Sequence, residues 1–161
     1  MREMRKGQRR MDTDRALEVF DKAPYVTLSM VRPSGLPYAV PVNMVRRDAE
    51  TFYFHCAFEG EKIDCLREQP VVSLSAVSRC HPAFEEEKEN FTEHYHSAIA
   101  LGKAETVNDP VEKTEALRLL CERFLPKNMD HFETAVARSL ERTNVIRIRL
   151  LEPPVGKKKG D

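Results

Sequence analysis

The sequence passes from a strand into a helix within Phe54-His55-Cys56-Ala57-Phe58-Glu59-Gly60-Glu61-Lys62-Ile63-Asp64-Cys65-Leu66 (residues 54–66). Gly60 supplies the turn, and the spacing of Ile63 and Leu66 predicts a short helix that buries both side chains. The start of a helix directs unpaired N–H groups and a partial positive charge at one spot, which favours an anion there. Lys62 adds a full positive charge where helices usually carry acids. A bound phosphate explains this lysine, and an ordinary lysine on a surface helix is the alternative interpretation.

Segments of alternating polarity lie on both sides of this stretch. Every second side chain is apolar, which is the period of a half-buried strand. We expect six strands, at residues 25–32, 36–46, 51–56, 71–79, 94–107 and 143–151. Pro37 and Pro41 cannot donate ladder hydrogen bonds, so we expect the second strand at a sheet edge or at a break where a ligand reaches the backbone. Residues 80–93 are expected to form a polar loop, and Gly102 to mark a bulge or bend.

Four helices are expected beside these strands. The first begins at Asp12 or Thr13, and the second is the short helix at residues 60–68. Two capping boxes, Asp109 to Glu112 and Asp130 to Glu133, predict the starts of the others. Short strands joined mostly by tight turns predict an antiparallel β-barrel with peripheral helices, a mainly β fold, rather than a βαβ sheet.

The composition predicts one ordinary globular domain. We expect a basic N-terminal arm (1–11), a single domain (12–152) and a basic C-terminal tail (153–161), with both ends solvated. Lys and Arg number 26 and Asp and Glu number 26, so the chain lacks the positive field typical of nucleic-acid-binding proteins. Neither a membrane-spanning run nor a secretory signal is expected. The four cysteines form no C-x-x-C pair, which is consistent with a reduced, cytoplasmic protein.

Several motifs in a common order carry a resemblance to a known family. They are F-H-x-A-x-x-G-x-K-x-x-x-L at residues 54–66, Pro41-Val42-Asn43-Met44 on the preceding strand, and the segment Asn90 to Ala104. In order and spacing, residues 12–157 resemble the nitroimidazole-resistance branch of the pyridoxamine 5'-phosphate oxidase-like flavoproteins.

This resemblance implies a six-stranded antiparallel FMN-binding split β-barrel that forms a homodimer with flavin sites at the interface. The cofactor implied is FMN, with FAD and haem less favoured. By position, Gly60 and Lys62 would hold the phosphate, and the strand segment at 42–44 would line the isoalloxazine ring largely through its backbone. The full set of cofactor-binding residues implied in this way is Lys62, Gly60, Val42, Asn43, Met44, His55, Cys56, Ala57, Ser75 and Ser97.

The function implied is that of an FMN-dependent oxidoreductase that takes electrons from NADH or NADPH. Its acceptor would be a small molecule, with nitro compounds such as 5-nitroimidazoles as candidates. Because the flavin performs the redox step in such enzymes, we expect no separate nucleophile or acid–base pair. His55 is either structural or a contact to flavin or substrate. The alternatives are a non-enzymatic flavin- or haem-binding protein for storage or sensing, and a dimeric structural module that has lost the site.

A second histidine group needs separate consideration. His94 and His96 project from one strand face, with Cys80 and His81 upstream, a spacing that can serve a metal or a haem. Metal ligation needs three or four converging groups. We therefore expect no metal site, and we expect these histidines to be exposed or at an interface.

Overall fold

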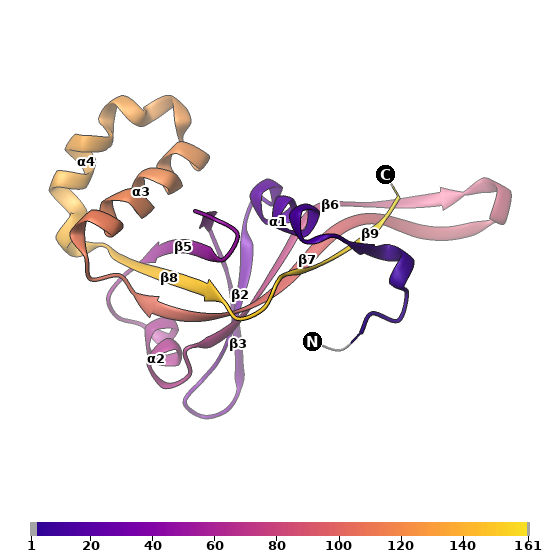
Figure 1. Cartoon of the computed structure of the whole chain (residues 1–161), viewed down its shortest axis with the longest axis horizontal. Coiled ribbons are helices and arrows are strands. Elements are labelled where there is room, and N and C mark those ends of the chain that lie inside the picture. Colours follow the sequence, from indigo (N-terminus) through magenta and orange to yellow (C-terminus); the bar gives the residue numbers. More distant parts are fainter. Residues whose placement is uncertain (1–2, 161) are drawn as a thin grey trace.

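The computed structural model describes residues 3–160, so residues 1, 2 and 161 of the predicted arm and tail lie outside the described part. The protein is mainly β, with one antiparallel nine-stranded sheet and helices at its periphery (Figure 1). The strands are β1 (Arg10–Met11), β2 (Val26–Val31), β3 (Pro37–Val42), β4 (Val45–Arg46), β5 (Thr51–Cys56), β6 (Val71–Glu85), β7 (Asn90–Thr106), β8 (Asn144–Leu150) and β9 (Val155–Lys159). The α-helices are α1 (Thr13–Lys22), α2 (Glu61–Glu68), α3 (Pro110–Phe124) and α4 (Phe132–Ser139). The predicted split β-barrel class is thereby confirmed, although the sheet has more strands than the six expected.

The sheet opens between β3 and β5. The strand order is β3-β2-β6-β7-β8-β5-β4, so β3 is an edge strand, as its prolines predict. The strand predicted at residues 36–46 is interrupted at Asn43 and Met44, and only β4 continues beyond them. β4 pairs with β5 only through Val45 and Arg46, so the end of β5 has a strand neighbour on one side alone within the described residues. The split therefore lies between two strand edges.

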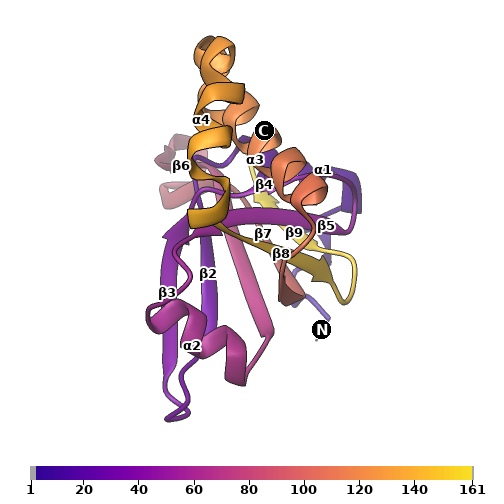
Figure 2. The ribbon, with the colours of Figure 1, turned by 90° about the vertical axis from the view of Figure 1, so that its left-hand side faces the viewer.

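The core fills the concave side of this sheet. α1 packs there through Leu17 and Phe20, and the Phe20 ring meets the edge of Phe52 at a centroid distance of 5.3 Å. Side chains of β3, β5 and α2 join the same core cluster, which connects the two edges of the split. A second, smaller cluster lies beneath α3 and α4 around the fully buried Tyr53. Figure 2 shows α2 beside the β2–β3 hairpin and the α3–α4 pair at the opposite end.

The predicted polar loop at 80–93 is wrong. Residues 71–85 and 90–106 instead form one long hairpin that projects from the body of the molecule (Figure 1). Cross-strand pairs of rings stabilise its outer part. The ring centroids of Phe84 and Phe91 lie 4.8 Å apart, and those of His81 and His94 lie 5.3 Å apart. The alternation of apolar and polar residues is weak at residues 80–93 because no hydrophobic core covers either face of this part of the hairpin.

The β-bulge also differs from the prediction. It lies between Val77 and Arg79, whereas Gly102 pairs regularly with Val72 and Leu150. A Cβ at Gly102 would lie 2.4 Å from Cγ2 of Ile148. The glycine is needed for close side-chain packing between neighbouring strands, not for a bend.

Residues near both ends of the chain form strands of the sheet, so the expectation that both ends are solvated is wrong for residues 10–11 and 155–159. β9 pairs with both β7 and β1, which the polar composition of the tail does not reveal. Close packing against α1 holds it: a Cβ at Gly156 would lie 2.9 Å from that of Ala16.

Two of the three predicted helix caps are confirmed. Asp12 accepts a hydrogen bond from the N–H of Arg15, and Asp109 accepts from those of Val111 and Glu112. The cap predicted at Asp130 is wrong, because a 3-10 helix (Pro126–His131) runs directly into α4. Within residues 3–160, no helix has the length and apolar character needed to cross a bilayer.

Candidate functional site

The start of α2 forms an open cradle beside the split. Gly60 precedes the helix at φ 113°, a conformation that side chains other than glycine rarely adopt. Its carbonyl accepts the N–H groups of Ile63 and Asp64, at 2.9 and 3.1 Å. Apart from Gly60 and its two chain neighbours, no atom of residues 3–160 lies within 4 Å of the position a Cβ would take at Gly60, so the space in front of this turn is open. The predicted anion position is therefore geometrically accessible.

Lys62 lies at the meeting point of α2 and β5. It is half-buried, and its Nζ lies 5.4 Å from the centroid of the Phe54 ring. Its charge acts on the two residues that end β5, His55 and Cys56. The lysine thus faces the end of β5, and the sequence prediction that residues 54–62 form one constellation agrees with this geometry.

The last two residues of β5 face opposite sides of the sheet. Cys56 packs against the main core, and burial raises the pKa of its thiol although the charge of Lys62 opposes the rise. His55 faces the helices instead, and desolvation together with the Lys62 charge holds the pKa of its imidazole below the ordinary value of 6.5. His55 is therefore neutral at pH 7, with one nitrogen able to donate and the other able to accept.

The segment at 42–44 offers mainly its backbone, as expected from the resemblance. The side chains of Val42 and Met44 are buried in the core, while Asn43 is exposed. Asn43 borders an open cleft of about 650 Å³ with Tyr25 and Thr27. The carbonyl of Met44 accepts a hydrogen bond of 2.8 Å from Arg123, a long-range contact that no sequence signal indicates.

Arg123 is a positioning residue that the sequence analysis missed. Its guanidinium also donates to the carbonyls of Phe20 and Ala23, each at 2.8 Å. One side chain of α3 thereby ties the end of α1 to the 43–44 segment. Burial lowers the pKa of Arg123, but the three carbonyl acceptors suit its cationic form.

Ala57 and the two predicted serines lie at different places. Ala57 is exposed after β5, and its carbonyl accepts a long hydrogen bond of 3.5 Å from Asn144. Ser75 is half-buried on the outer face of the sheet, directly opposite Thr27 of β2. Ser97 lies one strand farther out, opposite Val77 and Lys157. The fold of one chain does not bring Ser97 to the cradle at Lys62.

His55 lines a pocket that the sequence analysis did not predict. The pocket has a volume of about 310 Å³ and lies between the end of β5 and the α3–α4 pair. Most of its lining is apolar, from residues such as Leu117, Phe132 and Val136, and His131 is a second imidazole in its wall. A small, flat, largely apolar molecule with one or two polar atoms matches this lining.

A network of charged groups supports β5 from beneath α3. Tyr53 donates to Glu112 at 2.6 Å, and Arg147 binds the same carboxylate at 2.9 Å. Burial and this hydrogen bond raise the pKa of Tyr53 to about 12. Burial opposes ionisation of Glu112, but the bonds from Tyr53 and Arg147 bring its pKa below the ordinary value. The network fixes the strand that carries His55 and has no exposed reactive group.

Cys80, His81 and His94 lie on the projecting hairpin, away from this site. Cys80 contacts Glu93, and His81 packs against His94. Over residues 3–160, no three or more His, Cys, Asp or Glu side chains are grouped so that they can hold a metal ion.

The split therefore fits FMN in three respects. The open glycine turn and Lys62 suit a phosphate, strand edges on both sides leave backbone groups for polar contacts, and the 42–44 segment presents main chain at the far end.

A model of the family described as pyridoxamine 5'-phosphate oxidase matches residues 12–154. No curated protein matches the sequence. Among solved structures, a candidate 5-nitroimidazole antibiotic resistance protein from Bacteroides thetaiotaomicron is similar with a TM-score of 0.77 at 20% identity, covering 92% of this chain and 86% of that one.

Two further structures have a similar fold. The flavocytochrome Anf3 from Azotobacter vinelandii gives a TM-score of 0.82 at 20% identity, over 99% of this chain and 73% of that one. A FAD and heme binding protein from Mycobacterium smegmatis gives a TM-score of 0.78 at 19% identity, covering 93% of this chain and 72% of that one. Likeness at this level of identity establishes the shared fold.

Proposed function

The chain belongs to the pyridoxamine 5'-phosphate oxidase family, and from this premise we propose that it is an FMN-dependent oxidoreductase with its cofactor in the split between β3 and β5. Electrons would come from NADH or NADPH and pass to a small acceptor. The observation that carries the proposal is the open cradle at Gly60 with Lys62 at its side. Bound FMN would supply the redox chemistry, and the protein would supply position and electrostatics.

Each part of the split has a separate task under this proposal. Lys62 neutralises a phosphate that the N–H groups at the start of α2 also bind. The main chain at residues 42–44, held by Arg123, borders the ring. The end of β5, with Cys56 and Ala57, would border the ring or the ribityl chain, and Ser75 would supply a hydroxyl donor from the outer face of the sheet.

His55 and its pocket are proposed to receive the acceptor. The neutral imidazole can donate one hydrogen bond to a nitro or carbonyl oxygen without adding a charge. The largely apolar lining suits a small aromatic ring. A 5-nitroimidazole has these properties, and the likeness to the Bacteroides protein makes it the first acceptor to test.

A homodimer is part of the same proposal. The outer face of the sheet exposes Val31, Val71, Val77 and Ile99, each between 41% and 49% accessible. Ser73 and Ser75 separate Val71 from Val77 on β6, so the face is mixed. Exposed apolar side chains on such a face are the feature that favours an interaction surface. In such a dimer, Ser97 of one subunit would contribute to the split of the other subunit. The proposal thereby gives Ser97 a place in a flavin site that its own chain does not complete.

Comparing FMN with riboflavin tests the cradle directly, because riboflavin lacks only the phosphate. We expect Lys62→Gln to weaken FMN binding about tenfold or more and to leave riboflavin binding unchanged, as measured by quenching of flavin fluorescence. Lys88→Gln is the matched control, since Lys88 lies in the turn at the tip of the projecting hairpin, away from the split. Equal loss for both flavins, or no loss of FMN, would refute the phosphate assignment.

Reduction under anaerobic conditions separates an enzyme from a binding protein. We expect NADH or NADPH to bleach the flavin absorbance of the FMN-loaded protein, and a nitroimidazole to restore it. Bleaching by neither nucleotide would favour a storage or sensing protein. A protein that takes up no flavin would instead be a structural module without a working site.

Haem binding is the second candidate, because His55 and His131 line one largely apolar pocket. Two imidazoles in apolar surroundings are suitable haem ligands. The volume of about 310 Å³ favours a smaller molecule. A Soret band on adding haem that is lost in His131→Phe would support haem, and its absence would leave the flavin proposal alone.

A further inference from the structure

The open cleft beside Asn43 has an aromatic wall that the proposed function leaves without a role. Tyr25 lines this cleft of about 650 Å³ together with Thr27, Pro41, Val42 and Asn43. Tyr25 is 52% exposed and lies directly before the first residue of β2. An exposed aromatic ring at the edge of an open cleft offers a surface on which another flat ring can stack.

The pairing of β2 with β3 determines which residues meet at this cleft. The last pair of the ladder joins Val26 with Val42 in the antiparallel hairpin (Figure 2). The next position of the same register places Tyr25 beside Asn43. Because Val26 and Val42 are buried in the core, the alternation of side chains directs their neighbours Tyr25 and Asn43 to the outer face of the sheet.

One side chain of α3 fixes both walls of the cleft. The guanidinium of Arg123 donates to the Ala23 carbonyl at 2.8 Å, and Tyr25 follows two residues later, after a proline that restricts the backbone. The same guanidinium donates to the Met44 carbonyl at 2.8 Å, directly after Asn43. The fold therefore holds the cleft in shape before a ligand binds, which reduces the entropy lost on binding.

Tyr25 lacks the contacts that the other three tyrosines of the chain make. Tyr38, Tyr53 and Tyr95 each have a Lys or Arg cation over the ring, at 5.2 to 5.6 Å from the ring centroid. Within residues 3–160, the Tyr25 side chain has no ring contact, no cation over its face and no hydrogen bond. Its ring is therefore available to a ligand.

We propose that Tyr25 is the ring-stacking residue of the flavin site, with the isoalloxazine ring of FMN against its face. This inference rests on the proposed function and adds the residue that positions the ring. Isoalloxazine has apolar faces and polar atoms at its edge, so its site needs both kinds of contact. The Thr27 hydroxyl and the Asn43 amide line the same cleft, and Ser75 lies directly opposite Thr27. These groups supply hydrogen bonds to the polar edge of the ring.

Flavin fluorescence tests the contact, because a phenol stacked on isoalloxazine quenches its emission by donating an electron to the excited ring, and phenylalanine does not. We expect FMN bound to the wild-type protein to be strongly quenched. FMN bound to Tyr25→Phe should be several-fold brighter at saturation, with unchanged affinity. Tyr38→Phe is the matched control and should stay quenched, since Arg32 occupies the face of the Tyr38 ring.

Binding affinities separate the ring end of the flavin from its phosphate end. Tyr25→Leu removes the aromatic face and should weaken FMN and riboflavin equally, about fivefold each, as measured by isothermal titration calorimetry. Lys62→Gln should instead weaken FMN alone.

Four results would overturn the stacking assignment and leave the flavin proposal intact. They are quenched FMN in Tyr25→Phe, equal brightening in Tyr25→Phe and Tyr38→Phe, unchanged affinity for both flavins in Tyr25→Leu, and a loss in Tyr25→Leu that is confined to FMN. A wild-type protein that binds no flavin would overturn both proposals.

Discussion

His55 shows how a neighbouring cation changes the chemistry of an imidazole. Desolvation lowers the pKa of His55, and the charge of Lys62 acts in the same direction. For Cys56, burial raises the pKa of the thiol and outweighs the opposing charge of Lys62, so the thiol stays protonated near neutral pH. The same lysine thus favours the neutral form of His55 but acts against the neutral form of Cys56.

Titration of His55 by NMR tests this coupling. We expect its pKa to lie below 6.5 in the protein without added flavin, and to rise in Lys62→Gln because the repelling charge is gone. His55→Asn identifies the resonance. Because the folded chain binds this proton less well than the unfolded chain, its contribution to stability is present above pH 6.5 and is lost as the pH falls toward the folded pKa. A His55 pKa that is the same in both proteins would contradict the coupling.

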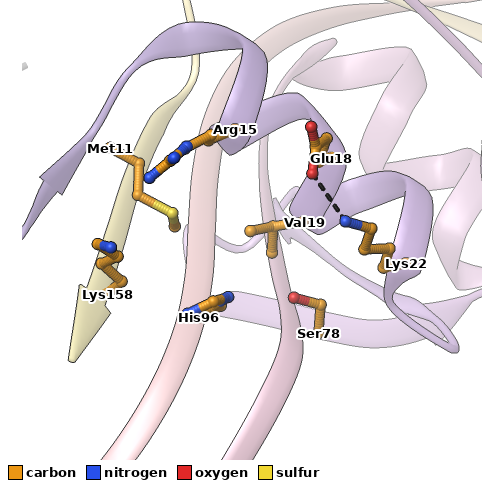
Figure 3. A pocket seen from close by; sticks show the side chains of 8 residues that line it. All are labelled: Met11, Arg15, Glu18, Val19, Lys22, Ser78, His96 and Lys158. Atoms are coloured by element: carbon orange, nitrogen blue, oxygen red, sulfur yellow. Dashed lines mark hydrogen bonds and ion pairs between the residues drawn. The ribbon is translucent and has the colours of Figure 1, made fainter. Parts of the chain in front are cut away.

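The C-terminal strand is an element whose position depends on one close approach. β9 crosses α1 at Gly156, where the backbone of Ala16 and the side chain of Met11 leave no room for a side chain. The same contact positions Lys158 and Met11 at a pocket between α1, β6 and β9, which Figure 3 shows. Displacement of β9 would therefore open the pocket without touching the split.

Gly156→Val tests the importance of that approach. We expect a loss of about 1–3 kcal/mol in the free energy of unfolding, because the added side chain must push α1 and β9 apart. Urea denaturation measures it, and Gly7→Val is the control, since no atom lies within 4 Å of a Cβ at Gly7. Flavin binding should be retained in the folded fraction of both variants. Equal stability of the two variants would show that β9 moves aside freely.

In the described part of the chain, the outer side of the sheet carries several exposed apolar side chains. α1 packs on the inner side of the sheet, α3 and α4 cover β5 and β8, and Cys65 of α2 belongs to the inner core, so these helices leave the outer side of β2, β6 and β7 uncovered. Ser75 and Ser97 lie on that outer side among the exposed valines. A second copy seated there would bury both serines.

Charges placed on this face test the proposed dimer. We expect the wild-type protein to have the mass of a dimer in light scattering, and the double variant Val77→Glu with Ile99→Glu to be monomeric, because two carboxylates would have to be buried at the interface. Val111→Glu is the control, since Val111 on α3 is 75% exposed elsewhere. Because the proposed partner completes the split, FMN affinity should fall in the monomeric double variant. A dimeric double variant would place the interface on another face.

Local sequence patterns were sufficient to predict much of this protein's secondary structure and fold class. The alternation of β2 and β5, the cap at Asp109, the edge position of a strand with Pro37 and Pro41, and the glycine turn before Lys62 all follow from local stereochemistry. The contacts of Arg123, the presence of His131 and His55 in one pocket, the pairing of β9 and the pocket between α1, β6 and β9 all join residues far apart in sequence. Such contacts depend on how complete elements pack, and polar tails or hairpins without a hydrophobic face carry no periodic signal. The chain's local chemistry therefore specified its elements and the glycine turn before Lys62, whereas packing in three dimensions created its pockets.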